Sequence, residues 1–120
     1  MEFIIELKEA VPVIVYRMVL FAAMLFALLM ALIPSQLDPT KFINDKLKHA
    51  VTFFVLFFLL DIFAFPTETF ALWKPVSLLV FGIIIEVMQE RTGYRQFSVG
   101  DIVANVVGIS CYCLFFYFLP

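Results

Sequence analysis

The chain has 120 residues, of which 64% are hydrophobic and only 15% are charged, and its formal net charge is −2. Soluble domains carry roughly 25% charged residues, so this composition excludes an ordinary soluble domain and indicates an integral membrane protein. The basic residues are few and scattered, which argues against a nucleic-acid-binding surface. Cys111 and Cys113 lie two residues apart in an apolar run, and they fit neither a disulfide framework nor a Cys-x-x-Cys metal site.

The order of apolar runs predicts an all-α protein, a membrane-embedded four-helix bundle that forms a single domain over residues 1–120. Residues 2–11 have the periodicity of a short amphipathic helix, which we expect to lie on the bilayer surface. The expected spans are residues 12–33, 45–65, 75–90 and 99–119. Lipid does not tolerate irregular backbone, which leaves a helical bundle as the architecture.

Signals between the apolar runs predict how the spans begin and end. Asp38-Pro39 is typical of a helix start, Asn44 is expected to cap the second span, and Gly93 is expected to stop the third. Four successive spans form two helical hairpins, so the first and third loops must lie on the same side of the membrane. The positive-inside rule favours the cytoplasm for these loops, but several of their charges belong to the candidate site described below, so the orientation stays open.

Three isolated basic or aromatic residues near the span ends fit simple roles at the membrane surface. Arg17 is expected to extend its guanidinium toward the interface. Trp73 and Lys74 are expected to anchor the start of the third span in the headgroup region.

Polar residues recur at helical spacing near the same end of three spans. The rows are Asp45 and His49, then Gly82, Glu86 and Gln89, then Asp101, Asn105 and Gly108. Residues four apart share a helix face, and the glycines would let the helices approach closely beside the polar groups. We therefore expect a polar site where the three rows meet.

Several members of this site also have simpler interpretations. His49 and its neighbouring lysines would suit a solvated first helical turn, and Ser98-x-x-Asp101 has the spacing of a capping box. Arg91 and Arg95 would suit interfacial anchors.

Glu86 and Asn105 do not have such simple interpretations, because both lie at least one turn inside an apolar run. A carboxylate at depth costs roughly 2.5–3.5 kcal/mol even on insertion scales. We therefore expect Glu86 to face protein, to pair with a cation, to bind a metal or to be protonated, and a cationic partner such as Arg95 or Lys46 is the simplest of these solutions.

The combined motifs resemble those of the VanZ-like family between about Pro34 and Gly108. They read Asp45-Lys46-x-x-His49, Gly82-x-x-x-Glu86-x-x-Gln89 and Arg95-x-x-Ser98-x-x-Asp101-x-x-x-Asn105-x-x-Gly108. The resemblance implies a small multi-pass protein of the bacterial cytoplasmic (inner) membrane, and the family's namesake is associated with low-level resistance to the glycopeptide antibiotic teicoplanin. The site residues that it implies are Asp45, Lys46, His49, Glu86, Gln89, Arg95, Ser98, Asp101 and Asn105.

The first functional hypothesis is a binding site for an anionic amphiphile, such as a lipid-linked envelope precursor or a lipoglycopeptide. Arg95 and Lys46, with Lys48 as a further candidate, would hold a phosphate or carboxylate, and Glu86, Gln89 and Asn105 would shape the site. Ser98 belongs to the same motif, with helix capping as its expected role. The apolar tail of the ligand would lie between helices.

Two further hypotheses stay open. In an enzyme, His49 would act as general acid or base, oriented by Asp45 or Asp101, and Glu86 would be a second proton-transfer group. A divalent metal would find ligands among His49, Asp45, Glu86 and Asp101. Alternatively, the cluster is a structural hydrogen-bond network. The sequence indicates neither an organic cofactor nor an oligomeric state.

Overall fold

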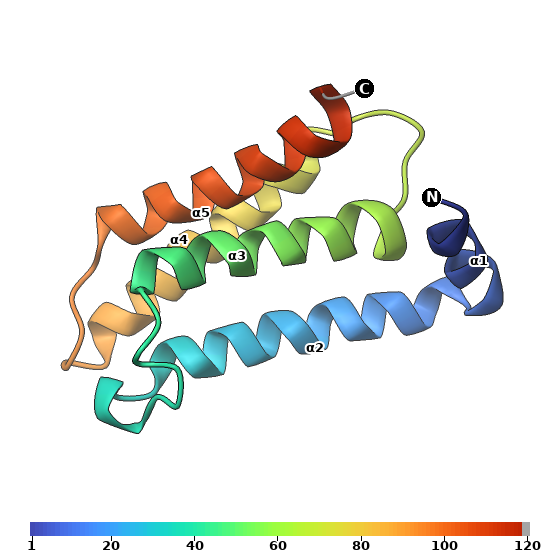
Figure 1. Cartoon of the computed structure of the whole chain (residues 1–120). Coiled ribbons are helices and arrows are strands. Elements are labelled where there is room, and N and C mark those ends of the chain that lie inside the picture. Colours follow the sequence, from blue (N-terminus) through green and yellow to red (C-terminus); the bar gives the residue numbers. More distant parts are fainter. Residues whose placement is uncertain (119–120) are drawn as a thin grey trace.

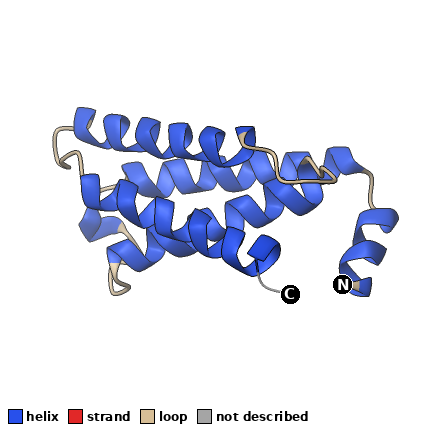
Figure 2. Ribbon diagram, turned by 90° about the horizontal axis from the view of Figure 1, so that it is seen from above, coloured by secondary structure: helices blue, strands red, loops and turns tan. Residues whose placement is uncertain are grey.

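A computed structural model describes residues 1–118, and in that range the chain consists of helices joined by loops, with no strand (Figures 1 and 2). Its five α-helices are α1 (Glu2–Ala10), α2 (Val13–Leu32), α3 (Asp45–Phe58), α4 (Trp73–Arg91) and α5 (Val99–Cys113). A 3₁₀ turn, η1 (Ser35–Leu37), follows α2, and the π-helical segments η2 (Leu59–Ala64) and η3 (Leu114–Phe118) extend α3 and α5. The predicted N-terminal helix and the four predicted spans are thus present as helices, with ends within about two residues of the observed ones where the structure describes them.

Three of the helical segments are long and apolar enough to cross a membrane, which indicates a multi-pass membrane protein. They are α2, α3 with η2 (Asp45–Ala64), and α5 with η3 (Val99–Phe118). The remaining predicted span corresponds to α4, which is not among these candidates. Its charged residues are Lys74, Glu86, Glu90 and Arg91.

The connections lie where the hairpin prediction puts them. The α2–α3 and α4–α5 connections are at one end of the molecule, and α1 and the α3–α4 connection are at the other (Figure 1). Asn44 caps α3, because its Oδ1 accepts hydrogen bonds from Lys46 N (2.9 Å) and Leu47 N (3.2 Å). Gly93 follows α4 with φ of 85°, a conformation that glycine adopts without strain.

The helix predicted to start at Asp38-Pro39 is not present. The turn η1 ends at Leu37, just before Asp38. The Asp38 carboxylate instead accepts hydrogen bonds from Thr40 N and Thr40 Oγ1, both at 2.7 Å. A short local turn therefore satisfies the carboxylate that was expected to cap a helix, as is common for Asp in loops.

The tightest packing in the bundle joins α3 to α5. At Gly108 a Cβ would meet the Ala50 carbonyl oxygen at 2.1 Å, and at Gly82 it would meet Asn105 Nδ2 at 2.6 Å. The prediction that these glycines permit close approach is confirmed. Phe53, Phe57 and Tyr112 fill the core beside this contact.

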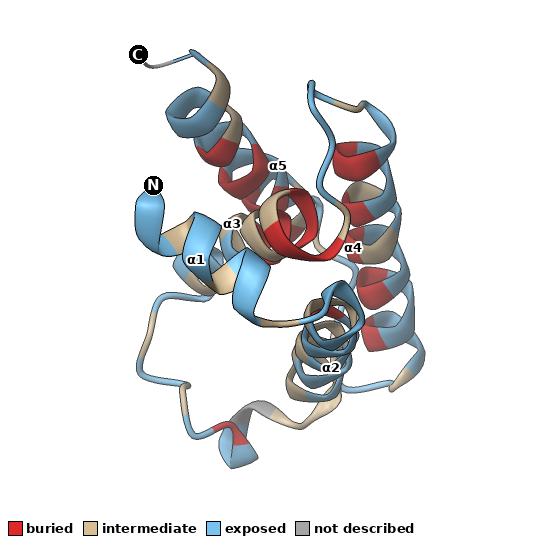
Figure 3. Cartoon of the chain, turned by 90° about the vertical axis from the view of Figure 1, so that its right-hand side faces the viewer, coloured by how far each residue is buried: buried red, intermediate tan, exposed pale blue. Residues whose placement is uncertain are grey.

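The outer surface and part of the interior differ from those of a soluble protein. Among the described residues 1–118, the buried polar residues are Asp38, Asp61, Lys74, Glu86, Gln89, Asp101 and Asn105, and 36 large hydrophobic residues are exposed. Buried positions are concentrated on α3, α4 and α5, while α2 is mostly exposed and has Leu20 as its one buried residue (Figure 3). This pattern fits a bundle whose outer surface contacts lipid.

A second buried polar cluster lies at the end of the bundle opposite the candidate site. Lys74 is fully buried, and its Nζ donates to Asp61 Oδ1 at 2.6 Å. Tyr112 and Tyr117 donate to Asp61 Oδ2 at 2.6 and 2.7 Å. The prediction that Lys74 anchors at the headgroups is therefore wrong, because a carboxylate and two phenols on neighbouring elements give its charge an internal partner.

Arg17 also turns toward protein rather than simply extending to the interface. Its Nε donates to the carbonyl oxygen of Ala64 at 2.8 Å, and its guanidinium lies 4.3 Å from the centroid of the Phe65 ring. Ala64 ends η2, so Arg17 satisfies a carbonyl that has no partner further along the helix.

Candidate functional site

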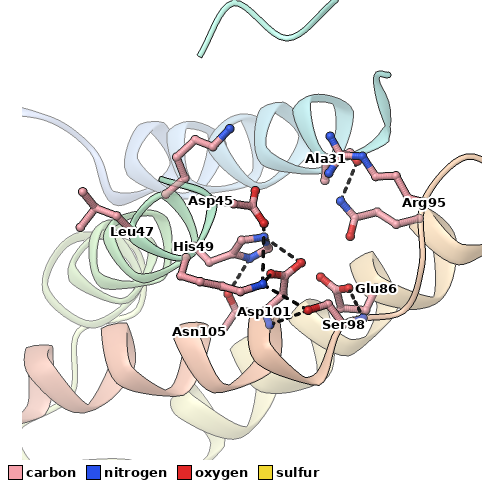
Figure 4. A network of polar contacts seen from close by, with 12 residues as sticks. Ala31, Asp45, Leu47, His49, Glu86, Arg95, Ser98, Asp101 and Asn105 are labelled. Carbon is pink, nitrogen blue, oxygen red and sulfur yellow. Dashed lines mark hydrogen bonds and ion pairs between the residues drawn. The ribbon is translucent and has the colours of Figure 1, made fainter. Parts of the chain in front are cut away.

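The centre of the candidate site is the carboxylate of Asp101, which α3 and α5 surround with polar groups (Figure 4). Lys46 Nζ forms an ion pair with Asp101 Oδ1, and His49 Nε2 lies 3.4 Å from Asp101 Oδ2. On its other side His49 Nδ1 lies 2.9 Å from Asn105 Oδ1. The first turns of α3 and one face of α5 therefore come together as the spacing predicts, and His49 is half-buried rather than part of a solvated turn.

Ser98 caps α5, but only half of the expected capping box forms. Ser98 Oγ accepts from Asp101 N at 3.1 Å. In a complete box the Asp101 carboxylate would accept from Ser98 N, but here that N–H donates to Glu86 Oε2 of α4 at 3.1 Å. Glu86 thereby leaves both oxygens of Asp101 free to contact Lys46 and His49.

Of the alternatives expected for Glu86, burial against protein is observed, whereas pairing with Arg95 or Lys46 is not. Glu86 is fully buried, yet within residues 1–118 it makes no ion pair with Arg95 or Lys46, and its Oε1 has no hydrogen-bond partner there. Lys46 is instead occupied by Asp101 and by Ser98 Oγ at 3.2 Å. Figure 4 shows the Glu86 carboxyl group directed toward Asp101, so two carboxyl groups from different helices share one small space.

Gln89 and Arg95 do not join this cluster, because they bind the C-terminal end of α2. Gln89 Nε2 donates to the Ala31 carbonyl oxygen at 2.8 Å, and Arg95 Nη2 donates to that of Ile33 at 3.4 Å. Tyr94 Oη donates to the intervening Leu32 carbonyl oxygen. Three successive carbonyls that α2 leaves without internal partners are thus satisfied, and a cation stands at the negative end of the helix dipole.

A groove of about 540 Å³ opens between α2 and α3 next to this cluster. Its polar end contains Asp38, Thr40, Asp45, Lys48, His49, Gln89 and Arg95. Its walls are apolar and include Ala23, Phe26, Ala27, Met30, Val51, Val55 and Leu56. The groove is therefore polar at the loop end and apolar along the helices.

A fixed ion pair stands at the mouth of the groove. Lys48 Nζ donates to Asp38 Oδ2 at 3.1 Å and to Thr40 Oγ1 at 3.3 Å. The two hydrogen bonds from Thr40, together with the charge of Lys48, lower the pKa of Asp38 from 3.8 to about 2 against the opposing effect of burial. Asp38 is therefore a carboxylate at neutral pH, and it neutralises one of the cations that line the groove.

Three of the four predicted metal ligands come together. Asp45, His49 and Asp101 each offer one ligand atom, and these atoms all lie within 4.8 Å of one another. Glu86 is not part of this group and contacts it only through Asp101. Around Lys46 and His49 there are thus three carboxyl groups, which makes the cluster suited to holding cations or moving protons.

Sequence reasoning missed some contributors to the site. Gly100 lies where a Cβ would be 3.1 Å from Lys46 Cε, so its small size lets the lysine reach Asp101. The sequence signal for this role is that Gly100 lies two residues after the Ser98 cap and directly before Asp101. The sequence offers Lys48 as a further cation for a head group, but nothing local indicates that Asp38, ten residues earlier, would bind it.

No protein-family model, no curated protein and no solved structure matches the chain. The geometry of its own residues therefore supports an all-helical chain with three candidate membrane spans and a polar cluster beside an amphipathic groove.

Proposed function

We propose that the chain is a VanZ-like protein of the bacterial cytoplasmic membrane that binds an anionic amphiphile in the groove between α2 and α3. The charged head group lies at the polar end of the groove, and the apolar tail follows the helices. Lipid-linked envelope precursors and lipoglycopeptides such as teicoplanin belong to this chemical class. Binding without turnover is sufficient for a protective role.

The observation that carries this proposal is the division of the groove into a polar end and apolar walls. Ligand pockets usually enclose roughly 300–1,000 Å³ and combine apolar walls with a few oriented polar groups, and this groove of about 540 Å³ has both features. The apolar walls run along two candidate spans, α2 and α3. An acyl chain lying there would remain at the depth of the surrounding lipid tails.

Arg95 is the residue best placed to recognise an anionic head group. It lines the groove, and its Nε is buried without a hydrogen-bond partner among the described residues. A buried donor without a partner costs about 1–3 kcal/mol, and a phosphate or carboxylate oxygen would remove this cost. The guanidinium favours such oxyanions through its fixed geometry, and Lys48 adds a second cation nearby.

The proposal includes α4 as a fourth membrane-spanning helix. Its Lys74 and Glu86 are buried within the bundle, whereas Val76, Val80 and Ile83 are exposed on its outer face. Charges that face protein do not contact lipid, so the length and outer surface of α4 are compatible with a span despite its composition.

A purely structural role for the polar cluster explains part of the geometry. Gln89 and Arg95 do tie the α4–α5 hairpin to α2. A structural network does not require an open groove beside it, however, and it leaves Arg95 Nε without a partner. The competing catalytic role rests on the contact of His49 with Asp101, and detection of a covalently altered ligand would favour it.

Binding of a fluorescent lysophosphatidic acid to the full chain in detergent tests the proposal. A neutral monoacylglycerol with the same tail and fluorophore reports the contribution of the phosphate. We expect the phosphate-bearing probe to bind at least about tenfold more tightly, a difference of about 1.4 kcal/mol. Equal binding of the two probes would overturn the assignment of an anionic head group.

A matched pair of substitutions on α2 tests the location. Ala27 lines the groove, whereas Ala22 lies on the exposed side of the same helix. Ala27→Trp should fill the groove and reduce binding by about tenfold or more, while Ala22→Trp should bind like the unmodified chain. Equal affinities of the two variants, with unchanged helicity, would exclude the groove as the binding site.

A further inference from the structure

The contacts of His49 leave one ring nitrogen in an unusual position. An amide oxygen can only accept, so the 2.9 Å contact with Asn105 Oδ1 requires the proton to be on Nδ1 of His49. In a neutral imidazole, Nε2 then presents a lone pair. That nitrogen lies 3.4 Å from Asp101 Oδ2, a carboxylate oxygen, so the contact is satisfied either by a second proton on the imidazole or by a cation that the two atoms share.

The nearest cation of the protein contacts the other oxygen of Asp101. Lys46 Nζ lies against Asp101 Oδ1 and Ser98 Oγ, and it is 3.9 Å from Asp45 Oδ2. Asp101 Oδ2 and His49 Nε2 lie 3.4 Å apart. One ligand atom from each of Asp45, His49 and Asp101 lies within 4.8 Å of the other two.

The charge balance of the cluster points in the same direction. Asp45, Glu86 and Asp101 contribute three carboxyl groups around one lysine and one histidine. Glu86 is fully buried, its Oε1 has no hydrogen-bond partner in residues 1–118, and its carboxyl group is directed toward Asp101 (Figure 4). A bound cation would add positive charge beside this group, in which Glu86 and Asp101 are buried and Asp45 is half-exposed.

We infer that Asp45, His49 and Asp101 form a binding site for a divalent transition-metal ion, with Zn²⁺ and Mn²⁺ as the class of ion that the ligands suit. Mixed imidazole and carboxylate ligands favour such ions over Ca²⁺ and Mg²⁺, which prefer oxygen alone. Asn105 acts as a positioning residue. Its acceptance of the Nδ1 proton fixes the tautomer that turns Nε2 toward the ion, as outer-shell partners of metal-bound histidines commonly do.

Three protein ligands leave coordination positions open, as in catalytic metal sites. Asp45 and His49 also line the polar end of the groove, so an open position would face the place where a head group enters. The metal site does not depend on amphiphile binding, and the tests below use the metal alone.

The direct test uses the fact that His49 is the only histidine of the chain. Protein carrying ¹⁵N-labelled histidine and purified without a histidine tag gives the signals of one imidazole. At pH 7.5, stoichiometric Zn²⁺ should shift the Nε2 resonance to the metal-bound range while Nδ1 stays protonated. An imidazole that is protonated on both nitrogens and unaffected by Zn²⁺ would overturn the inference.

Calorimetric titration with Zn²⁺, and electron paramagnetic resonance with Mn²⁺, give the stoichiometry and affinity. The full chain should bind one ion, and Asp45→Asn and His49→Gln should each weaken binding by at least about tenfold. Asn105→Leu should weaken it by about 10–100-fold, the usual effect of losing an outer-shell partner. Binding that persists in an Asp45→Asn/His49→Gln double variant would also overturn the inference.

Two features of the design separate loss of ligands from loss of fold. Asp45 is half-exposed, so Asp45→Asn should retain the helicity and thermal stability of the unmodified chain. The matched control is Glu90→Gln, which removes an exposed carboxylate on α4 outside the cluster and should leave Zn²⁺ affinity unchanged. If Glu90→Gln weakened Zn²⁺ binding as much as Asp45→Asn does, the affinity would depend on the net charge of the protein and not on these ligands.

Discussion

Gly108 of α5 lies directly against the backbone of Ala50 in α3. A Cβ built on Gly108 would be 2.1 Å from the Ala50 carbonyl oxygen and 3.1 Å from its Cα. Ala50 follows His49 in sequence, and Gly108 is three residues after Asn105, the hydrogen-bond partner of His49. The closest contact between the two helices therefore sets the distance across which the polar cluster forms.

Substitution of Gly108 by alanine should destabilise the bundle and separate these helices. The obstructing atom belongs to backbone, which cannot rotate away, so we expect a loss of about 1–3 kcal/mol or more in the free energy of unfolding. Thermal or denaturant unfolding in detergent measures the loss, with Val107→Ala, an exposed neighbour, as the control. A Gly108→Ala protein as stable as Val107→Ala would contradict the packing described here.

The helices and the meeting of three polar rows could be predicted because they depend on local periodicity. The positions of Asp45, His49, Asp101 and Asn105 follow from a 3.6-residue repeat once the hairpins are arranged in order. Gly82 and Gly108 indicate where helices approach closely for the same reason, because each follows the helical spacing of its polar row. Such signals are contained in short stretches of sequence.

The errors concern partners that are distant in sequence. Gln89 and Arg95 bind carbonyl groups at the end of α2 that are 58 and 62 residues away in sequence. Every residue has a backbone carbonyl group, so the sequence does not indicate which of them a side chain will bind. Lys74 resembles an interfacial anchor until Asp61 and two tyrosines are known to surround it. For Glu86 a cationic partner is one of the expected solutions, because a buried charge needs one, whereas in the structure the backbone N–H of Ser98, the N-cap of α5, contacts its carboxyl group.

The buried pair of Asp61 and Lys74 predicts a strong dependence of stability on both partners. Asp61→Asn leaves a fully buried ammonium group without its carboxylate, and breaking a buried pair typically costs about 3–5 kcal/mol. The double variant Asp61→Leu/Lys74→Met leaves no isolated charge and should recover much of this loss. A double-mutant cycle measured by unfolding gives the coupling, and additive losses would contradict a direct interaction.

The contact between Gln89 and the end of α2 predicts different effects for two substitutions of similar size. Gln89→Leu removes the donor to the Ala31 carbonyl oxygen and should cost about 1–3 kcal/mol, the penalty of an unsatisfied buried acceptor. Gln89→Glu should cost more, because it also places a negative charge at the negative end of the helix dipole.

Unfolding experiments show which of the two variants loses more free energy of unfolding. Hydrogen exchange should show faster opening of the last turn of α2 in both. Glu90→Gln, exposed on the next residue, is the control, and a stable Gln89→Glu protein would contradict the capping role.

The turn at the mouth of the groove should respond to acid through Asp38. Hydrogen bonds from Thr40 and the charge of Lys48 hold the pKa of this carboxyl group at about 2, below its ordinary value of 3.8. Its stabilising contribution is therefore fully present above pH 3.8 and is lost as the pH falls toward 2.

Carboxyl ¹³C resonances of the full chain should show Asp38 titrating near pH 2. In Thr40→Val the pKa of Asp38 should rise toward 3.8, because the hydroxyl donor is removed and the local turn is weakened. An Asp38 resonance that titrates at 3.8 in the unmodified chain would show that the turn and its ion pair with Lys48 do not form, and with them the polar mouth of the groove.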